Sequence, residues 1–206
     1  MPKFIPVAII VTIITVISLI TLSNVSDVKK LGNNWTSYKH TTAIKSELII
    51  EIQGNLGFGG MIHQFKNYIL RQDKEVADKV ERYIKSINTS LSKYVSLGLS
   101  SDEKAAINDI QAVVQQYNDN LIIAKDLVEN KATPKYLDSQ VKINDTPALH
   151  GLLTLTSILH NATKQHSKQI GSLVNEISFM LIITTPITLL LILITGMFMF
   201  IRRNTK

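Results

Sequence analysis

The chain reads FIPVAIIVTIITVISLITLS at residues 4–23 and ISFMLIITTPITLLLILITGMFMFI at residues 177–201. Neither stretch contains a charged side chain. Because an α-helix rises about 1.5 Å per residue, each stretch is long enough as a helix to cross the ~30 Å hydrocarbon core of a bilayer. The sequence therefore predicts two transmembrane helices, one at residues 4–23 and one at residues 177–201.

The acidic residues all lie between these two stretches, within residues 24–176. Arg202, Arg203 and Lys206 directly follow the second stretch. By the positive-inside rule, this short tail at residues 202–206 is cytoplasmic. Two crossings then place Lys3 in the cytoplasm as well, and they place the domain at residues 24–176 on the outer side of the membrane.

The lack of cysteine bears on the compartment in which the central domain lies. Without Cys, an external domain has neither disulfides nor thiol chemistry, which suits a bacterial periplasm better than a eukaryotic cell surface. No small-x-small cleavage site occurs between Thr21 and Ser26, so we expect an uncleaved anchor rather than a signal peptide. The predicted location is the bacterial inner (plasma) membrane, with a periplasmic main domain and cytoplasmic termini.

Net charge does not point to a nucleic-acid partner. The formal charge of the chain is +6, but four of the basic residues, Lys3, Arg202, Arg203 and Lys206, lie at the chain ends beyond the two apolar stretches. Residues 24–176 carry no basic run and no interleaved aromatic residues. We therefore expect no binding to nucleic acid.

Two heptad stripes dominate the central domain. Apolar residues separated by steps of three and four are typical of helices that pack at shallow angles in a bundle. The first stripe is Val76, Val80, Tyr83, Ile87, Leu91 and Tyr94, and the second is Ile107, Ile110, Val114, Tyr117, Leu121, Ala124 and Val128. The predicted fold is all-α: a membrane-anchored antiparallel four-helix bundle between two transmembrane helices, with helices at about 24–71, 73–97, 101–131 and 145–176.

Local signals mark the expected helix ends. Gly98 is suited to follow the C-terminus of the second helix, and Ser101, with Lys104 three residues later, is a candidate N-cap for the third. Asp145 or Thr146 is expected to cap the fourth helix, with a proline at position 147 in its first turn. Residues 131–144 are expected to be irregular.

Glycines gather in the interior of the predicted first helix. Four of the nine glycines lie within residues 54–60, although each costs up to ~1 kcal/mol in a helix relative to Ala. One interpretation is a loop or kink that divides the helix. The other is a groove in which Gly57, Gly59 and Gly60 let a ligand approach the backbone closely.

A polar array follows the glycines. His63, Lys66, Asn67 and Arg71 are spaced so that they share one side of a helix. Arg and Lys together favour a carboxylate or phosphate ligand, and Asp145 is expected nearby at the start of the fourth helix. The alternatives are a solvated face, or pairing of these charges with acidic residues such as Asp145.

Two segments resemble a known family. The run GFGGMIHQFKNYILR at residues 57–71 and the run NDTPAL at residues 144–149 are similar to the periplasmic sensory domain of some bacterial methyl-accepting chemotaxis proteins and transmembrane diguanylate cyclases. The resemblance covers about residues 5–201 and implies a four-helix input domain between two membrane helices. The chain departs from that layout after Ile201, where the family continues into a signalling coiled coil or a catalytic domain.

The expected function is that of a receptor-like input module. It would bind a small ligand or partner at the periplasmic bundle and transmit a helix shift across the membrane, as a homodimer or as a mixed dimer with a full-length receptor. The rival hypothesis is a non-sensing accessory or structural membrane protein, or a truncated receptor remnant that acts through mixed dimers. The short stretch after the second span favours the rival, and the polar array favours sensing.

No enzymatic motif is present in the sequence. The histidines do not form a His-Glu-x-x-His pair, no serine lies in a nucleophile elbow, and no glycine-rich loop follows a strand. A zinc site built from His63 and His150 is the one metal alternative that the spacing leaves open. We therefore predict no enzymatic activity, no catalytic residue, no metal and no cofactor.

Overall fold

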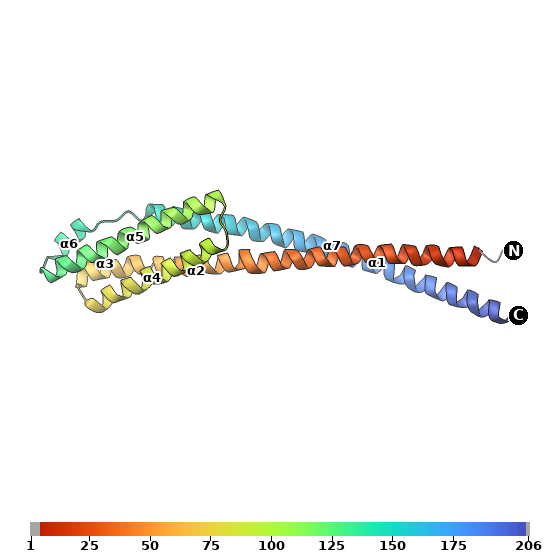
Figure 1. Cartoon of the computed structure of the whole chain (residues 1–206). Helices are drawn as coiled ribbons and strands as arrows, with labels where there is room; N and C mark the ends of the chain where they lie inside the picture. Colours follow the sequence, from red (N-terminus) through yellow and green to blue (C-terminus); the bar gives the residue numbers. More distant parts are fainter. Residues whose placement is uncertain (1–4, 205–206) are drawn as a thin grey trace. The chain divides into compact units, whose positions relative to one another are not determined.

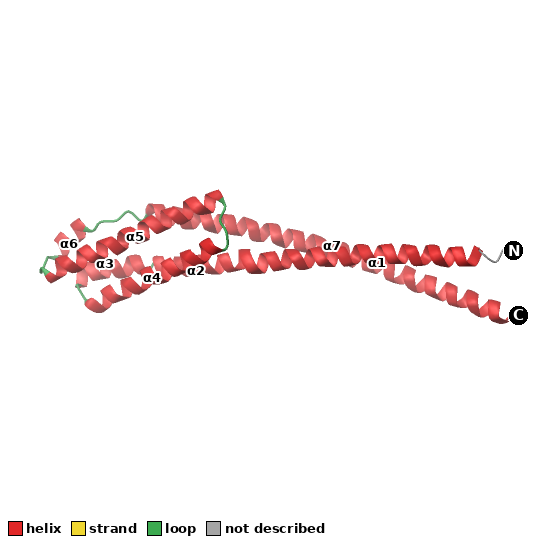
Figure 2. Ribbon diagram, viewed as in Figure 1, coloured by secondary structure: helices red, strands yellow, loops and turns green. Residues whose placement is uncertain are grey.

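The structure, a computed structural model, describes residues 5–204 (Figure 1). Phe4 of the first predicted span, Lys3 and residues 205–206 of the predicted tail lie outside the described residues. The described part contains helices and the turns between them, with no strand, which confirms the all-α prediction (Figure 2). Its elements are α1 (Ile5–Ser37), the π-helix η1 (Tyr38–Ala43), α2 (Ile44–Leu56), α3 (Met61–Arg71), α4 (Lys74–Ser96), α5 (Ser101–Glu129), α6 (Pro134–Gln140) and α7 (Thr146–Asn204).

The chain divides into two compact units. Unit 1 comprises Met1–Tyr38 and Lys164–Lys206, and unit 2 comprises Lys39–Thr163. Unit 1 therefore holds α1 and the C-terminal part of α7. Unit 2 holds α2 to α6 and the first turns of α7.

Unit 2 is a helical bundle. Helix α4 packs against α2, α3 and α5, and the short α6 packs against α3 and α5. The first turns of α7 approach α5 closely at Gly151, where an added Cβ would lie 2.6 Å from the carbonyl oxygen of Ala106. Helices α4 and α5 run in opposite directions and are joined by a short connection (Figure 1). These contacts confirm the bundle packing that the heptad pattern predicts.

The two heptad stripes form the core of unit 2. Every predicted stripe residue of α4 and α5 is buried except Tyr83 and Val128, which are partly buried against the same core. Met61, Phe65 and Ile69 of α3 are buried with them. In α7 the buried residues begin with Ala148, which is 0% exposed, whereas the neighbouring Leu149 is 50% exposed.

The predicted first helix at residues 24–71 is divided into shorter elements. Helix α1 ends at Ser37, and the π-helix Tyr38–Ala43 connects it to α2. A turn at residues 57–60 then separates α2 from α3. The structure therefore agrees with the interpretation in which the glycines break the helix.

Two local expectations were wrong. The N-cap of α5 is Ser100 rather than Ser101: the Glu103 N–H donates to the Ser100 hydroxyl oxygen at 3.2 Å, and the Ser100 N–H donates to the Glu103 carboxylate at 2.8 Å, which completes a capping box. The stretch expected to be irregular contains α6, which begins after the N-cap Thr133 and buries Leu137 fully. Gly98, in contrast, has a φ of +82° and follows the end of α4 as expected.

The half-buried side chains of unit 1 follow a heptad seam. On α1 they recur in steps of four and three: Ile13, Ile17, Ile20, Asn24, Asp27, Leu31, Asn34 and Tyr38. On α7 the half-buried residues include His166, Ile170, Leu173, Ile177, Thr184, Thr188, Leu191 and Thr195. The spacing is that of two helices that pack side by side along a coiled-coil seam.

Removing a core leucine tests the assignment of the stripes. Leu91 and Leu121 are 0% and 1% exposed, so Leu91→Ala or Leu121→Ala should lower the free energy of unfolding by about 2–5 kcal/mol. Thermal unfolding of the full chain in detergent, followed by circular dichroism, measures the change. Ile122→Ala is the matched control because Ile122 is 64% exposed. Equal losses at all three positions would contradict the assignment.

Candidate functional site

The glycines form a tight turn between α2 and α3. The Gly57 N–H donates to the carbonyl oxygen of Gln53 at 3.0 Å, and the Gly60 N–H donates to that of Gly57 at 3.0 Å. A Cβ on Gly60 would lie 2.2 Å from the carbonyl oxygen of Asn55, so no other residue fits there. Gly59 has a φ of +83° and no atom within 4 Å of its Cβ position. The turn itself thus accounts for Gly59 and Gly60.

The predicted polar array lies on α3, directly after this turn. The core-facing side of α3 carries Met61, Phe65, Tyr68 and Ile69. Lys66 and Arg71 are exposed, while His63 and Asn67 are half-buried. No ion pair in the described part of the chain involves Lys66 or Arg71. Their cationic groups are therefore available to an anion from solution.

An exposed aromatic ring stands beside the array. Phe58, in the glycine turn, is 98% exposed. Its ring lies 5.1 Å from the imidazole of His63, centroid to centroid, at an interplanar angle of 49°. The turn therefore presents a large apolar side chain to solvent next to the polar side of α3.

Asp145 is connected to α3 indirectly. Its carboxylate accepts a hydrogen bond of 2.6 Å from the Tyr117 hydroxyl, and the Tyr117 ring packs edge-on against Phe65 at 5.1 Å. Burial, together with the hydrogen bond to Asp145 and its negative charge, raises the pKa of Tyr117. No ion pair within residues 5–204 joins Arg71 to Asp145. The structure thus explains Asp145 as the acceptor for Tyr117.

A second polar cluster lies inside unit 2 and was not predicted. Lys45 of α2 and Glu103 of α5 form an ion pair of 2.7 Å, with side-chain exposures of only 8% and 6%. The Tyr94 hydroxyl of α4 donates to the same Glu103 oxygen at 2.7 Å, and the Lys45 ammonium lies 5.0 Å from the centre of the Tyr94 ring. The cluster therefore links α2, α4 and α5.

The surroundings of Glu103 keep it ionised. Burial alone would raise the pKa of its carboxyl group, but hydrogen bonds from Lys45, the Ser100 N–H and Tyr94, with the charge of Lys45, outweigh that effect and lower the pKa. Burial and the bond to Glu103 raise the pKa of Tyr94 in turn. Glu103 is thus a carboxylate and Tyr94 a neutral phenol near neutral pH.

The only signal of this cluster in the sequence is the capping box at Ser100 and Glu103. A correct choice of the cap would have placed Glu103 at the start of α5. It would not have shown Lys45 or Tyr94 beside it, because Lys45 is 58 residues away in the chain.

Among the described residues, no three His, Cys, Asp or Glu side chains gather as a metal site would require.

Comparisons with protein-family models, with curated proteins and with solved structures found no match. The all-helical fold and the two long apolar helices are therefore described by this structure alone, and the resemblance to bacterial sensory domains remains an expectation from the sequence.

Loss of the buried lysine should destabilise the bundle. Lys45→Met leaves the Glu103 carboxylate buried without its cation, which should cost about 3–5 kcal/mol of unfolding free energy. Denaturant unfolding of the full chain in detergent measures the loss. Lys125→Met is the matched control, because its ion pair with Glu81 is partly exposed and should contribute at most ~1 kcal/mol. Similar losses for both variants would show that the buried pair has no special role.

Proposed function

We propose that this protein is a membrane-anchored sensory input module of the bacterial inner membrane. In this proposal α1 and the C-terminal part of α7 cross the bilayer, unit 2 lies in the periplasm, and a small anionic ligand binds the polar side of α3. The observation that carries the proposal is the order of the elements. A helical bundle lies in the sequence between two helices that are long and apolar enough to span a membrane.

Exposed apolar side chains support insertion into a bilayer. Leu19 on α1 is 62% exposed, and Ile182 and Leu193 on α7 are 72% and 70% exposed. Rows of large apolar residues are costly in water and favourable in lipid. Pro186 lies inside the second apolar stretch, and prolines are tolerated in transmembrane helices.

The available charges on α3 support a ligand that carries a carboxylate or phosphate. Lys66 and Arg71 lie on the exposed side of the helix without an acidic partner among the described residues. A guanidinium offers two parallel donors to such an anion, and an ammonium adds charge. The half-buried Asn67 amide, between them in the sequence, adds a further donor.

Signal transmission would use α7. This helix runs from Thr146 in the bundle to Asn204, beyond the second apolar stretch, without an interruption. A ligand would shift α7 only by binding one arrangement of the bundle more tightly than another. The chain would act as a homodimer, in which the second copy supplies a surface against which α7 moves.

Phe58 favours a second candidate function, a docking surface for another protein. A fully exposed aromatic side chain is typical of the anchors that dominate protein–protein binding, and Phe58 is 98% exposed beside His63. Under this alternative, the chain is an accessory subunit and the α2–α3 turn is its contact. Phe58→Ala would then abolish partner binding, whereas loss of Arg71 would not.

Single cysteines test the topology, because the natural chain has none. Lys135 is exposed on α6, so Lys135→Cys should react with a membrane-impermeant maleimide in intact spheroplasts. Thr205→Cys, in the predicted cytoplasmic tail, should react only after permeabilisation, because the tail follows the positive-inside rule. Labelling of Thr205→Cys in intact spheroplasts would contradict the proposed arrangement.

A panel of small carboxylates and phosphates, including inorganic phosphate, tests the ligand site on the full chain in detergent. Arg71→Ala should weaken the binding of any hit by about 1.5–3 kcal/mol, measured by isothermal titration calorimetry, without lowering the unfolding temperature. Arg82→Ala is the matched control, since Arg82 is also an exposed arginine, on α4. Equal weakening by both variants would indicate general attraction by surface charge rather than a site.

A further inference from the structure

A polar groove lies between α1 and α7 in unit 1. Its volume is ≈ 600 Å³. All of its lining residues belong to unit 1, and none of them belongs to the candidate site on α3. Apart from Leu173, the lining side chains are polar: Lys30, Asn33 and Asn34 on α1, and Lys168, Gln169 and Ser172 on α7.

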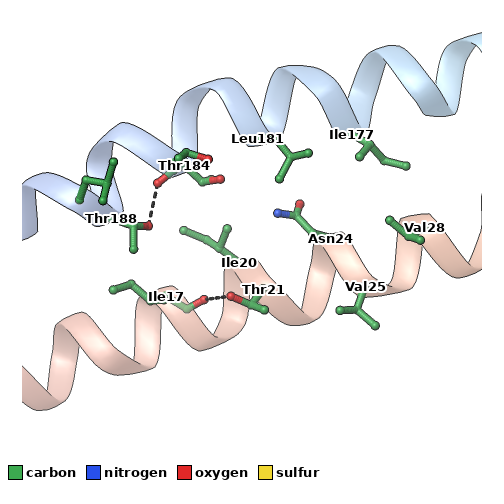
Figure 3. A pocket seen from close by; sticks show the side chains of 12 residues that line it. Ile17, Ile20, Thr21, Asn24, Val25, Val28, Ile177, Leu181, Thr184 and Thr188 are labelled. Atoms are coloured by element: carbon green, nitrogen blue, oxygen red, sulfur yellow. Dashed lines mark hydrogen bonds between the residues drawn. The ribbon is translucent and has the colours of Figure 1, made fainter. Parts of the chain in front are cut away.

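The polar groove lies just beyond the apolar part of the helix pair. A mostly apolar cavity between the same two helices is lined from residues 17–28 and 177–189 (Figure 3). The groove begins at Lys30, seven residues after the first apolar stretch, and ends at Leu173, four residues before the second. These spacings correspond to about 10 Å and about 6 Å along a helix. The groove therefore begins close to the headgroup layer, which extends ~5–8 Å beyond the hydrocarbon core.

Lys30 is directed toward the apolar part of α1. Side chains of an α-helix lean toward its N-terminus, and the Lys30 ammonium accordingly contacts the Asp27 carboxylate at 2.8 Å, about one turn earlier. The Lys30 side chain is still 62% exposed. Because an ammonium has three N–H donors, Lys30 retains donors for a further oxygen atom.

The α7 side of the groove offers groups without a partner in the described part of the chain. Lys168 forms no ion pair there, and the side chain of Gln169 forms no hydrogen bond. Both side chains are exposed, as is Asn33 on α1. The groove thus offers two ammonium groups, one from each helix, and uncharged amides beside them.

The charge around the groove is positive. Residues 24–37 and 164–176 together carry four lysines and only two acidic residues, Asp27 and Glu176. The Asp27 carboxylate is occupied by Lys30. Basic pockets between membrane helices bind anionic lipid headgroups, and a net positive charge favours an anionic headgroup over a zwitterionic one.

We propose that the polar groove binds the headgroup of an anionic phospholipid, of the phosphatidylglycerol type, in the periplasmic leaflet of the membrane. Lys30 and Lys168 contact the phosphate oxygens from the two helices. The amides of Asn33 and Gln169 hydrogen-bond to the headgroup hydroxyls, since an amide both donates and accepts. The inference rests on the proposed membrane insertion and adds a lipid ligand to it.

Exposed apolar side chains lie on the same side of each helix, where acyl chains would follow the headgroup. Leu19 precedes Lys30 by eleven residues, about three turns, and Phe179 follows Ser172 by seven residues, about two turns. Leu19 is 62% exposed and Phe179 is 64% exposed. One phospholipid thus contacts lysines with its phosphate and apolar side chains with its tails.

Native mass spectrometry of the full chain tests the lipid site. The chain is released from dodecyl maltoside micelles that contain phosphatidylglycerol, and the ratio of lipid-bound to free chain is measured. Lys30→Gln and Lys168→Gln should each lower this ratio roughly fivefold or more, because hydrogen bonds between an ammonium and a phosphate are among the strong ones.

Lys29→Gln and Lys164→Gln are the matched controls. Each removes the same charge from the same helix at nearly the same depth, but neither lysine lines the groove, and both are exposed. They should change the ratio by less than about twofold. Equal reductions by all four variants would overturn the proposal in favour of general attraction by surface charge.

Two other ligands give different results with the natural chain. Equal binding of phosphatidylcholine and phosphatidylglycerol would overturn the preference for an anionic headgroup, and the proposal with it. Displacement of phosphatidylglycerol by an equal concentration of inorganic phosphate would overturn the proposal in favour of a soluble anion in the groove.

Carbonate extraction of membranes that carry the chain separates failure of the lipid site from failure of membrane insertion. A chain that carbonate releases is not inserted, which refutes the proposed function and this inference together. A chain that stays in the membrane, but whose lipid binding is unchanged in Lys30→Gln and Lys168→Gln, refutes the lipid site alone.

Discussion

The packing of α4 against α2, α3 and α5 is the contact around which unit 2 is organised. Helix α4 directs a buried face toward the other helices, and Val80, Ile87, Leu91 and Tyr94 on that face are each 0% exposed. Burial of apolar area is the main favourable term in folding. Because α4 contacts α2, α3 and α5, the apolar side of each of these three helices packs against one shared core. The exposed side of α3, where the candidate ligand residues lie, follows from this placement.

The ion pair between Lys45 and Glu103 adds specificity to the packing of this apolar core. Two buried charges lose their hydration, so their attraction contributes little net stability relative to a well-packed apolar pair. Each buried charge nevertheless disfavours any packing of the helices that does not place the opposite charge beside it. Tyr94 completes the set from α4. We infer that the cluster selects one register of α2, α4 and α5. Apolar stripes alone would define this register less sharply.

Polar residues inside the heptad seam of unit 1 follow the same logic. Asn24, Asp27 and Asn34 occupy positions that apolar residues would fill in a simple coiled coil. Asp27 pairs with Lys30 at 2.8 Å within α1, whereas the Asn24 side chain points into the space between α1 and α7 (Figure 3). Polar groups at such positions lower stability and raise specificity.

The amino-acid sequence by itself determined the helical class, the two apolar stretches, the core stripes of α4 and α5, and the helix end at Gly98. These features depend on residues within one or two helical turns of each other, so periodicity and local backbone preferences are enough to specify them. The sequence also left two interpretations of the glycine cluster open. A choice between them required the 2.2 Å approach of a Gly60 Cβ position to the Asn55 carbonyl.

Tertiary structure alone decided the features that need partners distant in the chain. The Glu103 carboxylate, which completes the local capping box of α5, also binds Lys45 and Tyr94, which lie on other helices. Asp145 accepts from Tyr117, which is 28 residues away, and forms no ion pair with Arg71 among the described residues. Sequence spacing does not carry this information, because it states which side chains share a face of one helix and not which face of another helix lies opposite.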